Sequence, residues 1–419
     1  MDESELGEYL RARRCEAAAS RLPLRDIRVI DLGSVVAAPF GATMLGDYGA
    51  EVIKVEPPGV PDAIRTWGVI DDTYQPFWLL ISRNKLPITV NLKHSKGKEI
   101  FAKLVAQSDV LLENMRPGTL DRLGLPSAKL WEINPGLIVG RISGFGQTGP
   151  YATKPGFGTL AEAMSGFTHM NAHPGGPPTN PPLALADMIA GVHLALGVVI
   201  ALRSQKRGER GGQELDLSLY EPLFGFMGAD FLTYALSGIA PAPAGNEAHY
   251  TSPRNSYQTK DGKWVALSAS SQSPFERLMD LVGRPDLKQA PGFRNNQERI
   301  QSGSRVVLNR AIGDWIKARP MRDVLEECEK AGVTIGPVYG MEDISHDPHI
   351  RERGSIATLF DPGSGQEMPF PEIPIRLSET PGKLRFPGLP MGAATNVILE
   401  DLLGYRPEEV AALKQEGAI

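Results

Sequence analysis

Short runs of β-branched and aliphatic residues alternate with segments of helical periodicity along the first half of the chain. Helical patterns near residues 39–48 and 95–107 separate them. Because parallel strands need long crossover connections, this alternation is typical of a parallel sheet with helices between its strands. We therefore predict an α/β fold whose large domain holds a doubly wound parallel sheet. The predicted strands are IRVIDL (27–32), EVIKVE (51–56), PITVNL (87–92), DVLLEN (109–114), LIVGRIS (137–143) and QELDLSL (213–219).

The pattern changes after residue 220. APAPAGN (240–246) suits a linker, and the strands of a predicted hairpin then flank Asp261-Gly262, a preferred tight-turn pair. Helical patterns follow at 274–283, 304–318 and 321–331. We predict an exposed N-terminal extension at 1–21, a large α/β domain at 22–220, a linker at 221–250 and a smaller α+β domain at 251–335.

Composition excludes several classes of protein. The 419 residues carry a formal net charge of -5, which argues against a general nucleic-acid binder. Cys15 and Cys328 are the two cysteines, so a reducing, cytoplasmic location is expected. Acidic and basic residues mix in the first twenty positions, unlike a secretory leader. The apolar run 188–202 falls short of the ~20 residues that span a membrane, so we predict a buried helix and no membrane association.

Asp187 stands where an apolar helix is expected to begin, in PPLALADMIAGVHLAL. One interpretation is an N-cap, since Asp is among the best capping residues. The other is a nucleophile, because an ionised carboxylate at a helix start can attack an activated carbonyl. The local sequence leaves both open.

The motif GFGQTG (144–149) fits the glycine pattern of dinucleotide-binding proteins and follows a predicted strand. That fingerprint also needs the glycines to open a helix, so that the phosphates meet helix N–H groups. Pro150 and Pro155 follow at once, so we expect no helix there. A loop that approaches an acyl thioester closely is the functional interpretation, and a plain turn is the alternative.

Several segments occur in one order: 22–59, 84–125, RISGFGQTGPY and the Asp187 segment. Together they resemble the family III CoA-transferases, which include formyl-CoA:oxalate and carnitine-related enzymes. The resemblance implies transfer of CoA from an acyl-CoA to a carboxylic acid, through an aspartyl anhydride and an aspartyl-CoA thioester on Asp187. It implies no tightly bound cofactor, since the CoA thioester is a substrate, and no metal. It also implies that 336–419 returns to the large domain and that two chains interlock as a homodimer, with a related heteromeric partner as the alternative.

The resemblance also assigns residues to the site. Backbone N–H groups near Gly144 and Gly146 are expected to stabilise oxyanions beside Asp187. Arg116 and Arg122 flank a Pro-Gly turn just beyond strand DVLLEN, where ligands bind in open parallel sheets. Both are candidates for CoA phosphates, with Lys93 as a weaker one. The full set expected to bind CoA is Val35, Val36, Ala37, Val90, Lys93, Asn114, Met115, Arg116, Arg122 and Phe145.

Two alternatives to a transferase stay open. An α-methylacyl-CoA racemase shares the family, but it needs a His-Asp pair where this chain has Phe157 and Gly158. A catalytically silent CoA-binding subunit is the other, and the presence of Asp187 opposes it. His193, on the apolar helix, is interpreted as a core residue.

Overall fold

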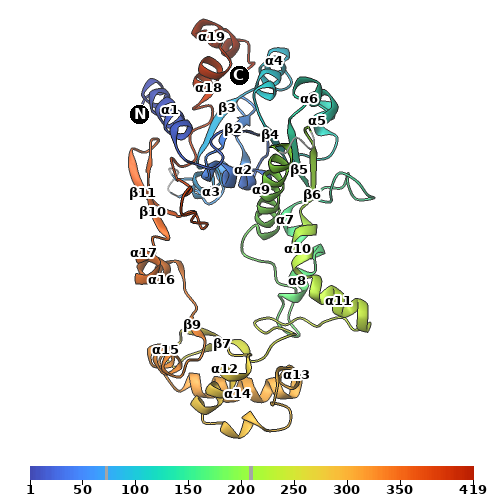
Figure 1. Ribbon diagram of the computed structural model, residues 1–419, viewed down its shortest axis with the longest axis vertical. Helices are drawn as coiled ribbons and strands as arrows, with labels where there is room; N and C mark the ends of the chain where they lie inside the picture. The colour runs from blue at the N-terminus through green and yellow to red at the C-terminus, as the bar shows by residue number, and fades with distance from the viewer. Residues whose placement is uncertain (71–73, 207–210) are drawn as a thin grey trace. The chain divides into compact units, whose positions relative to one another are not determined.

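The computed structural model describes residues 1–70, 74–206 and 211–419, and these form two compact units (Figure 1). The large unit contains Met1–Ser165, Pro181–Met227 and His349–Ile419. The small unit contains Gly166–Asn180 and Gly228–Pro348. Each unit is therefore assembled from stretches that are far apart in the sequence.

The large unit is built on a six-stranded sheet with the order β3-β2-β1-β4-β5-β6. Every neighbouring pair is parallel, which confirms the predicted parallel α/β sheet. The strand order reverses between β1 and β4, and ligands of open parallel sheets bind outside the carboxyl ends of the strands at such a point. The strands are β1 (Arg28–Asp31), β2 (Glu51–Glu56), β3 (Lys85–Thr89), β4 (Val110–Glu113), β5 (Ile138–Ser143) and β6 (Glu214–Ser218).

The third strand differs from its prediction. It starts at Lys85, which pairs with Val52, and it ends at Thr89 instead of Leu92. The Asn91 N–H donates to the Ala418 carbonyl at 2.8 Å, so the backbone leaves the sheet there. The predicted segment 87–92 is thus half strand and half loop.

Helices α2 (Ala37–Asp47) and α9 (Leu185–Lys206) pack against each other through glycines. A Cβ on Gly41 would lie 2.8 Å from the Gly191 carbonyl oxygen, and a Cβ on Gly191 would lie 2.7 Å from the Ala37 oxygen. Only glycine at both positions permits this approach. The contact fixes the first turns of α9 beside the start of α2.

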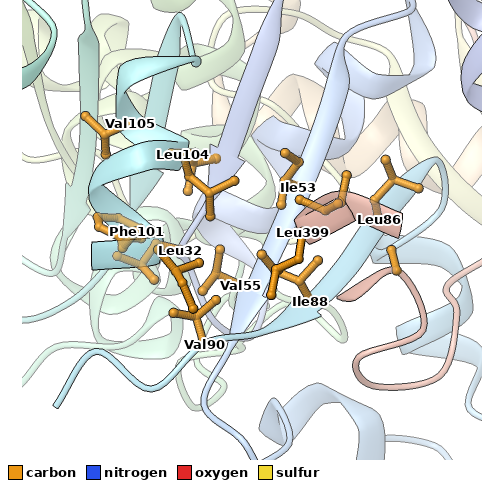
Figure 2. Packing of buried hydrophobic residues seen from close by; sticks show 14 of the residues in the cluster. Leu32, Ile53, Val55, Leu86, Ile88, Val90, Phe101, Leu104, Val105 and Leu399 are labelled. Carbon is orange, nitrogen blue, oxygen red and sulfur yellow. The ribbon is translucent and has the colours of Figure 1, made fainter. Parts of the chain in front are cut away.

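The main hydrophobic core joins the strands to α4 (Ser95–Ala106) and to segments near both ends of the chain. Figure 2 shows Phe101, Leu104 and Val105 of α4 close to strand residues such as Ile53 and Val55. Leu399 packs in the same cluster. Burial of this apolar surface is the main stabilising term for the unit.

Helix α1 (Glu3–Ala19) is part of this core, so the prediction of an exposed N-terminal extension is wrong. Asp2 and Glu5 form a capping box at its start, and Leu10 is fully buried. Arg11 pairs with Glu400 at 2.9 Å, which ties the helix to the C-terminal segment. The charged residues of this segment lie on a helix that buries one face, formed by Gly7, Leu10 and Ala17. Composition alone did not reveal that face.

The small unit has its own antiparallel sheet, β7 (Arg254–Gln258), β8 (Trp264–Ser268) and β9 (Ile335–Pro337). The predicted hairpin is confirmed, and Gly262 in its turn has φ +79°, a conformation that favours glycine. The three predicted helices are confirmed as α12 (Gln272–Leu281), α14 (Ser302–Lys317) and α15 (Met321–Lys330). They surround a separate core that includes Phe275 and Ile312.

The remaining elements are shorter. The helices are α3 (Pro76–Ile81), α5 (Thr119–Arg122), α6 (Ser127–Ile133), α7 (Gly158–Met164), α8 (Phe167–Met170), α10 (Tyr220–Phe226), α11 (Gly228–Ser237), α13 (Asn296–Arg299), α16 (Met341–His346), α17 (Pro348–Glu352), α18 (Thr395–Val397) and α19 (Pro407–Gln415). The 3-10 turns are η1 (Ala63–Thr66) and η2 (Pro285–Lys288), and η3 (Ile398–Leu402) is a π-helix. A hairpin of β10 (Ile356–Asp361) and β11 (Gln366–Pro371) completes the described elements.

Helix α9 is longer than the predicted apolar run and only partly buried. Among the described residues it is the one helix that is long and apolar enough to cross a membrane by length and composition, and 44% of its most apolar window is buried. A core helix of a soluble protein passes the same test. Its packing on α2, β5 and β6 identifies it as a structural helix of the large unit.

Replacing Leu10 with Ala is expected to lower the free energy of unfolding by about 2–4 kcal/mol, because the cavity forms in a fully buried position. Urea denaturation of the whole chain measures this change. The exposed Glu8 of the same helix gives the control, and Glu8→Ala is expected to change stability by less than about 0.5 kcal/mol. Equal effects of the two substitutions would contradict the docking of α1 on the core.

Candidate functional site

Asp187 lies in the first turn of α9, which begins two residues earlier at Leu185. It is therefore inside the helix, and the N-cap interpretation is wrong. The side chain is half-buried. The N-terminal end of a helix carries partial positive charge, so a carboxylate in this turn is favoured electrostatically.

Two residues of α7 face this turn, one helical turn apart. A Cβ on Gly158 would overlap Oδ2 of Asp187, so no side chain fits there without moving the carboxylate. Glu162 is 2% exposed, and its Oε1 accepts the N–H of Ala186 at 3.3 Å. Asp187 is thus bordered by a glycine that leaves room for it and by a second carboxylate.

The environment makes Asp187 less acidic than a free aspartate. Burial and, second, the negative charge of Glu162 together raise the pKa of Asp187 to about 6, against the opposing effect of a hydrogen bond from its own backbone N–H. Above pH 6 the ionised form predominates. A half-buried carboxylate that is ionised near neutral pH and unusually basic is suited to nucleophilic attack.

The GFGQTG loop lies close to this carboxylate. A Cβ on Gly144 would be 2.8 Å from the Cα of Gly156, so the backbone at the start of this loop touches the backbone just before α7. Gly158 follows two residues later, against Asp187. Gly144 is thus linked to the carboxylate through Gly156 and Gly158, while its role beside a thioester stays a prediction.

The far part of the loop is held by another carboxylate. Gly146 has φ +84°, and the next residue, Gln147, donates its N–H to both oxygens of Asp216 at 3.0 and 3.2 Å. Phe145 packs edge-to-face on Tyr151, with ring centroids 5.8 Å apart. No helix opens within 144–157, which confirms that the dinucleotide fingerprint lacks its structural context.

The loop between β1 and α2 carries a strained residue. Val35 has φ +62°, an uncommon conformation for a β-branched residue and one that clusters at functional sites. Its N–H donates to Asp62 at 3.0 Å, and Asp62 pairs with the buried Lys54 at 3.0 Å. Lys54 also donates to the Gly33 carbonyl. These contacts hold the strained loop in place.

Val36 and Ala37 have buried side chains, each 1% exposed. Neither residue therefore presents appreciable surface, whereas the preceding Val35 is partly exposed. Val36 belongs to a small cluster that also packs Val35 and Met188, the residue after Asp187. The predicted CoA loop and the first turn of α9 consequently meet.

A cavity of about 580 Å³ opens outside the carboxyl ends of β1 and β2. Three of the predicted CoA-binding residues line it, namely Val90, Lys93 and Met115. Its volume falls within the usual range of ligand sites. The other predicted residues lie outside its lining: Val35, Val36, Ala37, Asn114, Arg116, Arg122 and Phe145.

Three of the predicted cations are exposed at this edge of the sheet. Lys93 follows β3, while Arg116 and Arg122 follow β4. Arg122 donates to Thr119 Oγ1 at 2.8 Å. Asn114 exchanges hydrogen bonds with the backbone of Ser34 at 2.7 and 2.8 Å, so it joins two loops of the site.

Sequence reasoning missed Lys54, Asp62 and Glu162. A lysine inside the apolar strand EVIKVE was a usable signal, because a buried charge needs a partner. Glu162 gave no such signal, since its helix is short and its neighbour is distant in sequence. His193 donates from Nδ1 to the Ile189 carbonyl at 2.8 Å, in keeping with its interpretation as a structural residue.

Comparisons with known proteins agree with one another. The profile of CoA-transferase family III matches residues 24–395. The chain is 38% identical over 411 residues to the succinyl-CoA–L-malate CoA-transferase beta subunit of Chloroflexus aurantiacus, covering 96% of this chain and all of the relative. It is 31% identical over 399 residues to succinyl-CoA:glutarate CoA-transferase of Homo sapiens, covering 95% and 90%. A crystal structure of a CAIB/BAIF family protein from Brucella suis aligns with a TM-score of 0.79 and 30% identity, covering 91% of this chain and 99% of that one.

Asp187→Asn is expected to stabilise the protein, and more at pH 7.5 than at pH 4.5. Because folding raises the pKa of Asp187, the protonated carboxyl stabilises the folded state. This contribution is fully present below about pH 4 and is lost as the pH rises through about 6. The neutral amide avoids that loss. Because a half-buried group is partly screened by water, we expect a difference between the two pH values on the order of 1–2 kcal/mol.

Chemical denaturation at the two pH values measures this difference. Asp314→Asn, at an exposed position of α14, is the control and is expected to show no comparable pH dependence. A pH-independent effect of Asp187→Asn would contradict the raised pKa.

Proposed function

Because this chain belongs to CoA-transferase family III, we propose that it moves CoA from an acyl-CoA thioester to a carboxylic acid, with Asp187 as the nucleophile. The observation that carries this proposal is the half-buried, unusually basic carboxylate of Asp187, held against Gly158 in a turn of α9 whose Met188 packs with Val35 and Val36 of the β1–α2 loop. A carboxylate of this kind attacks thioesters directly and needs no added base.

The proposed reaction has four balanced steps. The Asp187 carboxylate attacks the donor carbonyl, the C–S bond breaks, and a mixed anhydride and free CoA thiolate result. The thiolate attacks the aspartyl carbonyl, which releases the donor acid and leaves an enzyme-CoA thioester. The acceptor carboxylate attacks that thioester and expels the thiolate, forming a second anhydride. The thiolate then takes the acceptor acyl group and restores Asp187.

The chain's own groups serve these steps by position and charge. We assign stabilisation of the oxyanions to backbone N–H groups near Gly144 and Gly146, a contribution typically worth ~3 kcal/mol per donor. We place the CoA in the cavity lined by Val90, Lys93 and Met115, with its phosphates toward Arg116 and Arg122. The β1–α2 loop would contact it at Val35, the partly exposed residue that precedes Val36 and Ala37.

The names of the relatives suggest the substrates. Two of them are named for succinyl-CoA and a second dicarboxylic acid, L-malate or glutarate. We therefore propose succinyl-CoA as a donor and a small dicarboxylic acid as an acceptor. This pair defines the first assay.

We also propose a homodimer. Helix α9 exposes Val192, Leu196, Val199 and Ile200, which recur at helical spacing along one face. An apolar stripe of this kind marks an interaction surface. We infer an interlocked arrangement from the family resemblance, while relatives named as alpha and beta subunits make a heteromer the alternative.

We further propose a doubly wound sheet and a cytoplasmic location. The reversal of strand order between β1 and β4 supports a doubly wound sheet. Cys15 and Cys328 are both free thiols, which suits a reducing compartment such as the cytoplasm.

Asp187→Asn is expected to abolish transfer from succinyl-CoA, by at least about a thousandfold, while the protein stays folded, because an amide cannot form the anhydride. The assay follows acyl-CoA products by mass spectrometry. Wild-type protein given succinyl-CoA and hydroxylamine should accumulate a peptide modified at Asp187. Substantial activity in Asp187→Asn, after deamidation back to Asp is excluded, would show that Asp187 is not the nucleophile.

Arg122→Ala is expected to raise the apparent KM for the CoA donor about tenfold and to leave kcat nearly unchanged. A contact with a phosphate distant from the reacting bond contributes equally to substrate and transition state. Steady-state kinetics over donor concentration separates the two constants. Arg322→Ala removes an exposed cation of α15 and serves as the control. An unchanged KM in Arg122→Ala would refute the phosphate contact.

A further inference from the structure

The carboxylate of Glu162 has no role in the four steps, yet it is almost completely buried beside Asp187. It lies one helical turn after Gly158 on α7, and Gly158 contacts Asp187 directly. Its Oε1 binds the N–H of Ala186, the residue that precedes Asp187. The two acids are therefore held against the same turn of α9.

No lysine or arginine lies within ion-pair distance of either acid in the described part of the chain. Other buried carboxylates of the large unit do have such partners, for example Asp31 with Lys85 at 2.7 Å and Asp47 with Arg83 at 2.6 Å. An uncompensated buried charge is unfavourable, and two neighbouring ones are more so. Such an arrangement is characteristic of functional sites.

We propose that Glu162 is a positioning residue for the reaction, whose negative charge raises the free energy of the ionised Asp187 carboxylate. This inference rests on the proposed function. The repulsion is present in the resting enzyme and is relieved when Asp187 becomes an uncharged anhydride or thioester. Glu162 itself forms no bond with substrate in this account. It also fixes the first turn of α9 through the Ala186 N–H.

Among the described residues, Glu162 is the side chain whose charge repels the ionised carboxylate of Asp187. Its effect adds to that of burial in raising the pKa of Asp187 to about 6. A more basic carboxylate is a stronger nucleophile, provided that it is still ionised at the working pH. The titratable residues of the other elements packed on α9 have partners of their own: Asp47 (Arg83), Arg141 (Glu113 and Glu214), Asp216 (Gln147 N–H), Glu221 (Ser218) and, in α9 itself, His193 (Ile189 carbonyl).

Glu162→Gln tests the charge with little change in shape. The amide oxygen can still accept the Ala186 N–H, while the charge is gone. Glu162→Asp keeps the charge on a shorter side chain. Glu221→Gln removes one charge from α10, a helix that also packs on α9, and is the matched control.

The first readout is independent of transferase activity. Protein labelled with ¹³C at aspartate carboxyls is titrated by NMR, and the Asp187 signal is assigned by its loss in Asp187→Asn. We expect Glu162→Gln to lower the Asp187 pKa by about half a unit or more, whereas Glu162→Asp and Glu221→Gln leave it raised. An unchanged Asp187 titration in folded Glu162→Gln would overturn the proposal.

The second readout is the rate at which succinyl-CoA and hydroxylamine modify Asp187 as a function of pH. We expect the acid limb of this profile to move to lower pH in Glu162→Gln and the plateau rate to fall about three- to tenfold. A plateau equal to that of the wild type would also overturn the proposal. Wild-type protein that forms no adduct would instead refute the transferase mechanism, and the NMR titration would still decide whether the two acids are coupled.

Discussion

The close contact between α2 and α9 is the constraint on which the site depends. Gly41 and Gly191 let the two helix backbones touch, and Gly191 is one turn beyond Asp187 on the same helix. The first turn of α9 is thereby fixed beside the start of α2, at the carboxyl edge of the sheet. A larger residue at either glycine would separate the helices and move the carboxylate away from the loops that surround it.

Buried ion pairs support the β1–α2 loop of the site. Lys54 and Asp62 hold the Val35 loop in a strained conformation, and Lys85 pairs at 2.7 Å with Asp31, the last residue of β1 before this loop. Burial lowers the pKa of Lys85 to about 8, against the opposing effect of Asp31. Two charges of this network, Lys54 and Asp62, line the cavity, whereas Lys85 and Asp31 lie outside its lining. A pre-formed loop reduces the entropy lost when a flexible ligand such as CoA binds.

Sequence patterns predicted the regular parts of this fold well. Five predicted strands match closely, and four of them are the nearly continuous buried runs typical of parallel strands, whereas β6 alternates in burial. The third strand was shifted because Asn91 bonds to Ala418, a partner more than three hundred residues away. Helix α1 was misjudged for a similar reason, since its buried face meets the C-terminal segment. Asp187 was found from its position in an apolar segment. Glu162 was not found, because the sequence of a seven-residue helix does not indicate which residues of another helix it will contact.

The core of the large unit also has a consequence for how the chain folds. Leu10, Phe101 and Leu399 belong to one cluster, so the first and last elements of this unit must come together before its core is complete. During synthesis, the early strands and α1 are made long before residues 386–399 leave the ribosome. Until then their apolar surfaces lack their partners and can associate with other chains. The small unit encloses its own core between residues 257 and 333 and faces no such delay. The large unit is therefore expected to finish folding last, and to be the part that most depends on chaperones during synthesis.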